Sequence, residues 1–337
     1  YPSQVPERRP PVDASRTRST KSISDKATDT ENNDDPAQLY KDVIEEVLSE
    51  VSKVHASAKL SKSQIDQTSE GKGKQNSQSL INAWERNVKS QVRELFNLID
   101  TRKNEMTVGG HLETLISIEK VYGMTEMPQL LSFNADNKRI WWMHVLSRLL
   151  LMLVLTPPSN ILYYRSLEWA LTRRYPSLRK QVVILSSRAA KVVIARICLR
   201  TGLKEGKVSH DGIDQRSKSF IDASMLRTLG SWLGAVTLSN DRPVWLKYLD
   251  IGSSLQTVLM EEDQIPRTKL HAVVSFTVEL LSSCVESSVF RLPNPWLAAI
   301  LRVLRDIRNR ELNVPLETEF AIDILFRRLG VKNEDLT

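Results

Sequence analysis

The chain has 337 residues, of which 41% are hydrophobic, so it holds enough apolar surface for one large folded domain or two small ones. Its formal net charge is +7. The two cysteines, Cys198 and Cys284, lie far apart in the sequence. This spacing argues against a disulfide framework and predicts a reducing, intracellular compartment. The longest apolar run, residues 140–155, contains His144 and Arg148 and is too short and too polar to predict a membrane span.

The first 77 residues have the composition of a tail. Tyr1 stands first and no charged-then-apolar leader follows, so we expect the chain to be a segment of a longer protein. Residues 1–36 contain almost no large apolar side chains, which predicts disorder. Apolar residues then recur every three or four positions from Leu39 to Val54, which predicts one amphipathic helix over about residues 37–55. Residues 57–77 are polar and contain glycines, so we expect a linker that leaves this helix isolated.

Helical periodicity governs residues 78–337. The apolar spacing predicts a run of helices, and a polar, glycine-containing loop over 202–218 separates two of them, with Asp222 as the expected N-cap of the helix that follows. Strand-like alternation is scarce and no glycine-rich phosphate loop follows a strand, which disfavours α/β enzyme folds. The helices are predicted over residues 80–99, 112–118, 140–155, 161–172, 178–199, 222–236, 249–260, 270–284, 295–307 and 320–329. We therefore predict an all-α, HEAT-like helical-repeat α-solenoid.

The sequence offers little from which to build a catalytic or metal site. The five histidines show no metal-ligand spacing, and His144 and His271 lie beside apolar residues, as satisfied core or boundary histidines do. Cys284 has no adjacent cation that would lower the pKa of its thiol, so we expect it to be inert. The sequence predicts no enzyme activity, no metal and no cofactor.

A basic band runs between Leu171 and Lys207, where ten Lys or Arg residues accompany one acid, Glu205. Two readings stay open: a solvated helix face, which we favour slightly, and a surface for RNA phosphates or an acidic protein. No aromatic-rich RNA-binding signature accompanies the band, so any RNA contact is expected to be accessory. The candidate basic surface consists of Arg188, Lys191, Arg196, Arg200 and Lys204.

Two stretches of the C-terminal half identify a family. Residues 229–238 read LGSWLGAVTL, followed by Arg242-Pro243 and Leu249-Asp250, and residues 289–296 read VFRLPNPW. Together they resemble the signature of the middle domain of initiation factor 4G (MIF4G-type), in the version carried by the Not scaffold subunit of the Ccr-Not deadenylase complex. Gly230 and Gly234 lie four apart, so they are expected to let a neighbouring helix approach closely, and Asn294 is expected to cap the helix that starts at Pro295.

The resemblance implies a non-catalytic scaffold that docks the Caf-type (Pop) poly(A) exonuclease, a DEAD-box RNA helicase and other Ccr-Not subunits, and so supports deadenylation, mRNA decay and translational repression. It also implies a cytoplasmic location, with processing bodies and a nuclear pool as further sites, and no membrane partner. The alternative is an initiation-factor-like module that binds RNA and a helicase directly. The residues expected to contact a partner or to shape the interface, with internal packing favoured over direct contact, are Trp232, Thr237, Arg242, Arg291, Asn294 and Trp296.

Overall fold

The structure is a computed structural model that describes residues 36–63, 85–86, 88–99, 107–125, 135–201, 212–260, 267–309, 314–332 and 336. All regular secondary structure in these ranges is helical, which confirms the predicted all-α class. None of the described helices is long and apolar enough to cross a membrane. The tail expected over residues 1–35 and most of the expected linker lie outside the described residues, so the domain boundary at residue 78 stays a prediction.

The helices follow one another with short connections. Residues 88–99 form a helix that carries no label. The remaining elements are α1 (Pro36–Ser63), α3 (Val108–Thr125), α4 (Ala135–Leu155), α5 (Ile161–Arg174), α6 (Leu178–Thr201), α7 (Gly212–Val236), the 3-10 turn η1 (Leu238–Asn240), α8 (Ile251–Met260), α9 (Arg267–Ser282), the 3-10 turn η2 (Ser283–Glu286), α10 (Pro295–Asn309) and α11 (Leu316–Leu329). The predicted helices over 140–155, 161–172, 178–199, 249–260, 270–284, 295–307 and 320–329 are confirmed to within a few residues, five at most, at each end.

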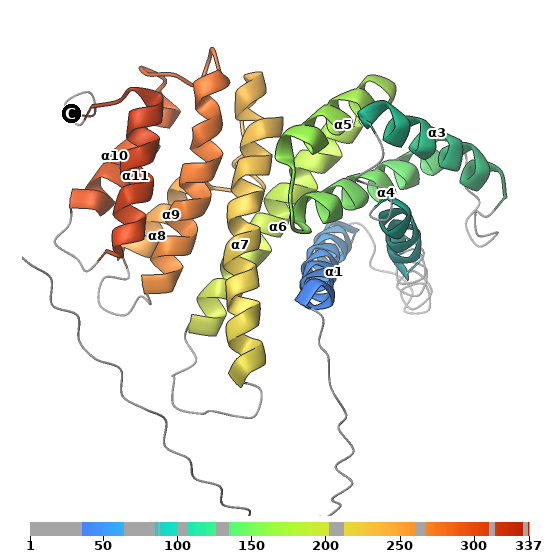
Figure 1. Ribbon diagram of the computed structural model, residues 1–337, viewed down its shortest axis with the longest axis horizontal. Helices are drawn as coiled ribbons and strands as arrows, with labels where there is room; N and C mark the ends of the chain where they lie inside the picture. Colours follow the sequence, from blue (N-terminus) through green and yellow to red (C-terminus); the bar gives the residue numbers. More distant parts are fainter. Residues whose placement is uncertain are drawn as a thin grey trace, which may run out of the picture. The chain divides into compact units, whose positions relative to one another are not determined.

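The helices from α4 to α11 form two layers (Figure 1). One layer contains α5, α7, α9 and α11, each touching the next, and the other contains α4 and α6, then α8 and α10. Successive helices pair across the layers, as α6 does with α7, α8 with α9 and α10 with α11. This stacking of helix pairs confirms the predicted helical-repeat fold.

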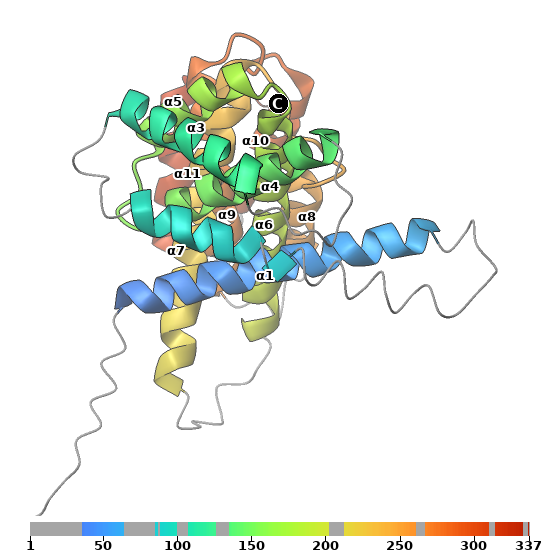
Figure 2. The same ribbon diagram turned by 90° about the vertical axis from the view of Figure 1, so that its right-hand side faces the viewer.

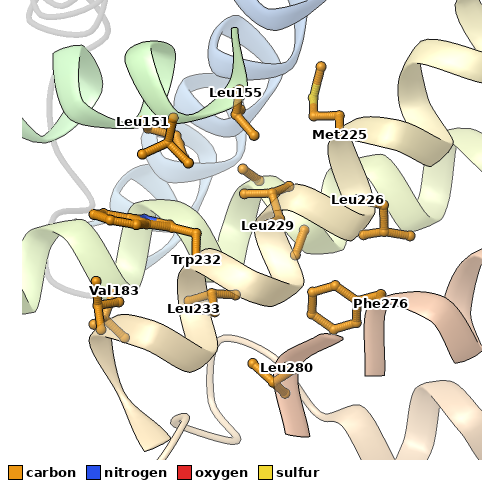
Figure 3. Packing of buried hydrophobic residues seen from close by; sticks show 14 of the residues in the cluster. Leu151, Leu155, Val183, Met225, Leu226, Leu229, Trp232, Leu233, Phe276 and Leu280 are labelled. Carbon is orange, nitrogen blue, oxygen red and sulfur yellow. The ribbon is translucent and has the colours of Figure 1, made fainter. Parts of the chain in front are cut away.

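Trp232 lies at the centre of the core. Its side chain is fully buried and points from α7 toward Leu151 of α4 and Val183 of α6 (Figure 3). The indole Nε1 donates a hydrogen bond of 3.1 Å to Ser186 Oγ, so its polar atom is satisfied inside the core. One helix of the first motif thus joins both layers through a single large side chain.

The two glycines of that motif set the distance between α7 and α9, the helix pair with the most extensive contact. A Cβ atom built at Gly230 would lie 2.5 Å from the carbonyl oxygen of Phe276, and one built at Gly234 would lie 2.5 Å from that of Leu280. Only glycine admits so close an approach of two helix backbones. The close approach predicted from the spacing of these glycines is confirmed.

Helix α1 differs from the expectation of an isolated helix, because its apolar face is part of the same core. Val43, Ile44, Val47, Leu48 and Val51 are each at most 5% exposed. The helix contacts α4, α6 and α7, and Figure 2 shows it running crosswise to α6 and α7. It also continues to Ser63, since no glycine or proline interrupts the helix-forming residues that follow position 55.

The start of α7 also differs from the sequence prediction. The helix begins at Gly212, inside the stretch that was expected to be a loop to residue 218. Asp222 is therefore an interior helix residue and not an N-cap, and its side chain is fully buried. Its carboxylate faces Arg196 of α6 at 3.6 Å, and this buried ionic contact explains why an acidic residue lies in the middle of a core helix.

Candidate docking surface

Among the described residues, no group of three or more His, Cys, Asp or Glu side chains is placed to hold a metal ion. His111 is buried, and its Nδ1 forms a hydrogen bond with the hydroxyl of Tyr163. His271 Nδ1 forms one of 2.9 Å with Thr318 Oγ1. Burial lowers the pKa of both imidazoles, which favours the neutral ring. These contacts are those of structural histidines between packed helices.

The thiol of Cys284 is 1% exposed, and burial raises its pKa to about 12. At pH 8 only about one thiol in ten thousand would then be ionised, so we expect iodoacetamide to leave Cys284 unmodified in the folded protein. The partly exposed Cys198 is the internal control and should be alkylated under the same conditions. Mass spectrometry of the digested protein measures both. Equal labelling of the two cysteines in the folded protein would contradict the burial of Cys284.

The first motif contributes mostly buried packing. Trp232 is 0% exposed and Thr237 is 1% exposed, with its hydroxyl donating to the carbonyl of Leu233. Neither side chain can touch a partner directly. Of the residues expected at the interface, these two therefore shape the helix pair beneath the surface, which is the role that the sequence favoured.

Asp241 joins the first motif to the second. It follows η1 with a left-handed backbone (φ 57°), which aspartate tolerates better than most residues. Its carboxylate accepts hydrogen bonds from Ser287 Oγ (2.6 Å), Ser288 Oγ (2.5 Å) and the backbone N–H groups of Ser288 (2.8 Å) and Val289 (3.1 Å). The donors, with the Ser287 hydroxyl first, hold the pKa of Asp241 well below its usual value. We call this arrangement the Asp241 clasp.

The second motif is a capped turn beside the clasp. Asn294 Oδ1 accepts from the backbone N–H groups of Trp296 (3.1 Å) and Leu297 (3.2 Å), and its Nδ2 donates to the carbonyl of Val289 (3.1 Å). The predicted N-cap of α10 is therefore confirmed. The half-buried ring of Trp296 lies edge-to-face against Phe290, with 5.6 Å between centroids, so Trp296 too mainly supports the turn.

The clasp holds two loops next to each other, and both expose apolar side chains. In the loop after η1, Leu246 is 63% exposed and Trp245 is 36% exposed, beside the exposed Arg242. In the loop after η2, Val289 is 53% exposed. We call Arg242, Trp245, Leu246 and Val289 the two-loop surface. Tryptophan and arginine beside aliphatic side chains are the residues that most often carry the binding energy of protein interfaces.

The basic band predicted on α6 is not one surface. Arg196 is 7% exposed and lies within 3.6 Å of three carboxylates, those of Glu46, Glu50 and Asp222, so its expected exposure is wrong. Arg188 is half-buried and lies over the ring of Tyr248, 5.5 Å from its centroid. Lys191 is exposed, whereas the Arg200 side chain and Lys204 lie outside the described residues.

Sequence reasoning did not single out Asp241, Trp245 or Leu246, and it treated Val289 only as the first residue of the 289–296 motif. The position of Asp241 carried a signal, because the sequence Ser239-Asn-Asp241 after a helix is typical of a turn with left-handed backbone. The apolar loop residues carried none. Nothing in their spacing distinguishes an exposed tryptophan in a loop from a buried one.

Paired helices with an exposed tryptophan and an exposed arginine on clasped loops are typical of a protein-docking module. The comparisons with known proteins agree. Residues 211–337 match the CCR4-NOT transcription complex subunit 1 CAF1-binding domain. This segment of the chain is similar to that family, which confirms the Not-scaffold resemblance.

Curated relatives each match about a third of the chain. The chain is 32% identical over 115 residues to the CCR4-NOT transcription complex subunit let-711 of Caenorhabditis elegans, covering 34% of this chain and 4% of the relative. It is 28% identical over 124 residues to the general negative regulator of transcription subunit 1 of Saccharomyces cerevisiae, covering 37% of this chain and 6% of the relative. The protein of the same name from Schizosaccharomyces pombe is 31% identical over 111 residues, 33% of this chain and 5% of the relative. The chain thus spans only a small fraction of these proteins.

Proposed function

We propose that the chain is a non-catalytic scaffold module of a Ccr-Not deadenylase complex that docks the Caf-type (Pop) poly(A) exonuclease subunit. One observation carries the proposal: the match to a CAF1-binding domain spans residues 211–337, and this range contains α7, the Asp241 clasp and both loops that the clasp joins. The hydrogen-bonded clasp of the segment therefore serves a rigid binding surface.

The mechanism of such a module is positioning. A nuclease held on a scaffold that is itself recruited to a messenger RNA acts at the effective concentration set by the tether, without any catalytic group from the scaffold. The close contact of α7 with α9 and the clasp supply what this role needs, because a rigid surface loses little conformational entropy when the partner binds.

The two-loop surface is the part of the segment best suited to that contact. Trp245, Leu246 and Val289 are exposed apolar side chains of the two loops, and Arg242 adds an exposed charged group with five N–H donors. Apolar anchors surrounded by polar groups are the usual centre of a stable interface. Because Asp241 ties its own loop to residues 287–289, the two loops are joined before the partner arrives.

We expect the double substitution Leu246→Glu and Val289→Glu to weaken binding to a recombinant Caf-type exonuclease subunit by at least roughly 30-fold, since carboxylates buried without partners in an apolar contact cost about 2 kcal/mol or more in total. Isothermal titration calorimetry with the 337-residue chain measures the Kd. The fold should persist, because both side chains are exposed in the unbound protein.

Leu162→Glu is the matched control, because Leu162 is 70% exposed on α5, outside the matched segment. Its Kd should stay within about twofold of the unmodified chain. Equal weakening by the control, or unchanged binding by the double variant, would remove the two-loop surface from the proposal. Absence of any binding between the unmodified chain and the exonuclease would overturn the proposed function itself.

A DEAD-box RNA helicase and other Ccr-Not subunits complete the proposed set of partners, with cytoplasmic mRNA decay and translational repression as the process served. The alternative, a module that binds RNA directly, loses support because Arg196 is buried and Arg188 stacks on Tyr248. A gel-shift titration with poly(A) and mixed-sequence RNA at physiological salt separates the two. Submicromolar, sequence-independent binding by the chain alone would favour the alternative.

A further inference from the structure

An open cleft of about 760 Å³ lies between the 290–293 turn, α10 and the C-terminal end of α11. Among the described residues that line it, three arginines are the only charged side chains: Arg291 from the turn, Arg302 from α10 and Arg328 from α11. Apart from Gly330, the remaining lining residues are apolar, Leu292 and Ala298 among them. We call this feature the arginine cleft.

The arginines of the cleft meet neutral acceptors. Arg291 Nε donates to the carbonyl of Ser287, and Arg328 Nη1 lies 3.5 Å from Ser282 Oγ. Arg302 Nε donates to the carbonyl of Leu336 at 3.1 Å. Among the described residues, neither Arg291 nor Arg328 forms an ion pair with a carboxylate.

A neighbouring arginine shows that the same helices can supply acids. Arg308 of α10 forms two hydrogen bonds with Asp323 of α11, and these hydrogen bonds raise the pKa of the guanidinium. The cleft therefore differs from the surroundings of Arg308, where the positive charge is matched within the helix pair. Each guanidinium has five N–H donors, so Arg291 and Arg328 keep donors for an incoming acceptor.

We propose that the arginine cleft binds an acidic linear segment of a partner protein, in which an Asp or Glu side chain lies next to an aliphatic one. Three like charges between apolar walls create a concentrated positive potential, and the planar guanidinium matches the two oxygens of a carboxylate. The apolar walls accept the aliphatic neighbour. An extended peptide fits an open cleft on a helical-repeat surface better than a compact ligand does.

A single-stranded RNA would suit the cleft less well. Base recognition in RNA-binding proteins relies on exposed aromatic or stacking side chains. Among the described residues, the one aromatic side chain that lines the cleft, Phe290, is only 7% exposed. The inference does not rest on the proposed function, because Arg302 and Arg328 lie outside the two-loop surface and the ligand need not belong to the exonuclease.

The test begins with a random dodecapeptide display library selected against the 337-residue chain. We expect selected peptides to be enriched in Asp or Glu beside Leu, Ile or Val. The most enriched peptide is then labelled with fluorescein, and fluorescence anisotropy measures its Kd. Arg328→Glu should raise that Kd at least tenfold, and Arg302→Gln should raise it in the same direction.

Arg327→Glu is the matched control, because Arg327 is also exposed in the last turn of α11 but does not line the cleft. Its Kd should stay within about twofold, with circular dichroism verifying that all variants are folded. Enrichment of peptides without acids, or equal losses for Arg327→Glu and Arg328→Glu, would overturn the inference. Binding of poly(A) that Arg328→Glu abolishes, without binding of acidic peptides, would overturn it in favour of RNA.

Discussion

Replacing Gly234 with alanine is expected to lower the free energy of unfolding by about 3 kcal/mol, at the upper end of the usual cost of overpacking a core. The added Cβ would lie 2.4 Å from Ser283 Oγ, 2.5 Å from the Leu280 carbonyl oxygen and 2.9 Å from Ser283 Cβ. The carbonyl belongs to the backbone of α9, so relief requires that two packed helices move apart. Urea denaturation followed by circular dichroism measures the change.

Gly252→Ala is the control for this substitution. Gly252 lies in the first turn of α8, and the nearest atom to an added Cβ there is Asp250 Oδ1 at 3.6 Å, an ordinary contact distance. Since alanine favours helix more than glycine does, this variant should unfold at the same or a slightly higher urea concentration. A Gly234→Ala protein as stable as the control would show that α7 and α9 are not held as close as the structure places them.

The same glycines show what a local pattern can predict. Gly230 and Gly234 lie four apart on a helix, and that spacing alone predicts one face without side chains. Apart from the start of α7, the helix boundaries from α4 onward followed from apolar periodicity for the same reason, because each depends on neighbours within a few residues. The capping role of Asn294 is equally local, since the side-chain oxygen and the backbone N–H groups that donate to it lie within three residues.

What could not be predicted depends on partners distant in the sequence. The apolar face of α1 indicated a helix that needs a partner, but no pattern names α4, α6 and α7, which lie about a hundred residues or more away. The two-loop surface could not be predicted for the same reason, because it depends on contacts between residues distant in the sequence. Asp241 bonds to residues 46 to 48 positions away, so the adjacency of its loops is a property of the fold and not of either segment.

Arg196 differs most from its sequence-based expectation, because it is buried beside carboxylates and not exposed on a basic surface. Spaced four residues from Arg200, it resembled part of a solvated basic face. In the structure Nη2 lies 3.0 Å from Glu46 and Nη1 lies 3.5 Å from Glu50, both on α1, while Nε lies 3.6 Å from Asp222 on α7. One side chain of α6 therefore links two helices that are remote in the sequence.

We expect Arg196→Met to lower the free energy of unfolding by about 3–5 kcal/mol, the usual cost of removing one partner from a buried ion pair. Methionine keeps much of the apolar stem, so the loss reports the missing charge. The carboxylate of Asp222 is 0% exposed and would lose its cation inside the core. Hydrogen exchange should also show weaker protection of α1 amides around residues 44–51, because both of its contacts to Arg196 disappear.

Lys191→Met is the control on the same helix, since Lys191 is exposed, and it should change stability by no more than about 0.5 kcal/mol. The double variant Arg196→Met/Asp222→Asn should recover part of the loss, because the amide removes the uncompensated charge and leaves only the more exposed Glu46 and Glu50 without their partner. If Arg196→Met matches the control in both stability and exchange, Arg196 is solvated as the basic spacing implied. If only the exchange of α1 changes, Arg196 serves to dock α1 and Asp222 is satisfied by other groups.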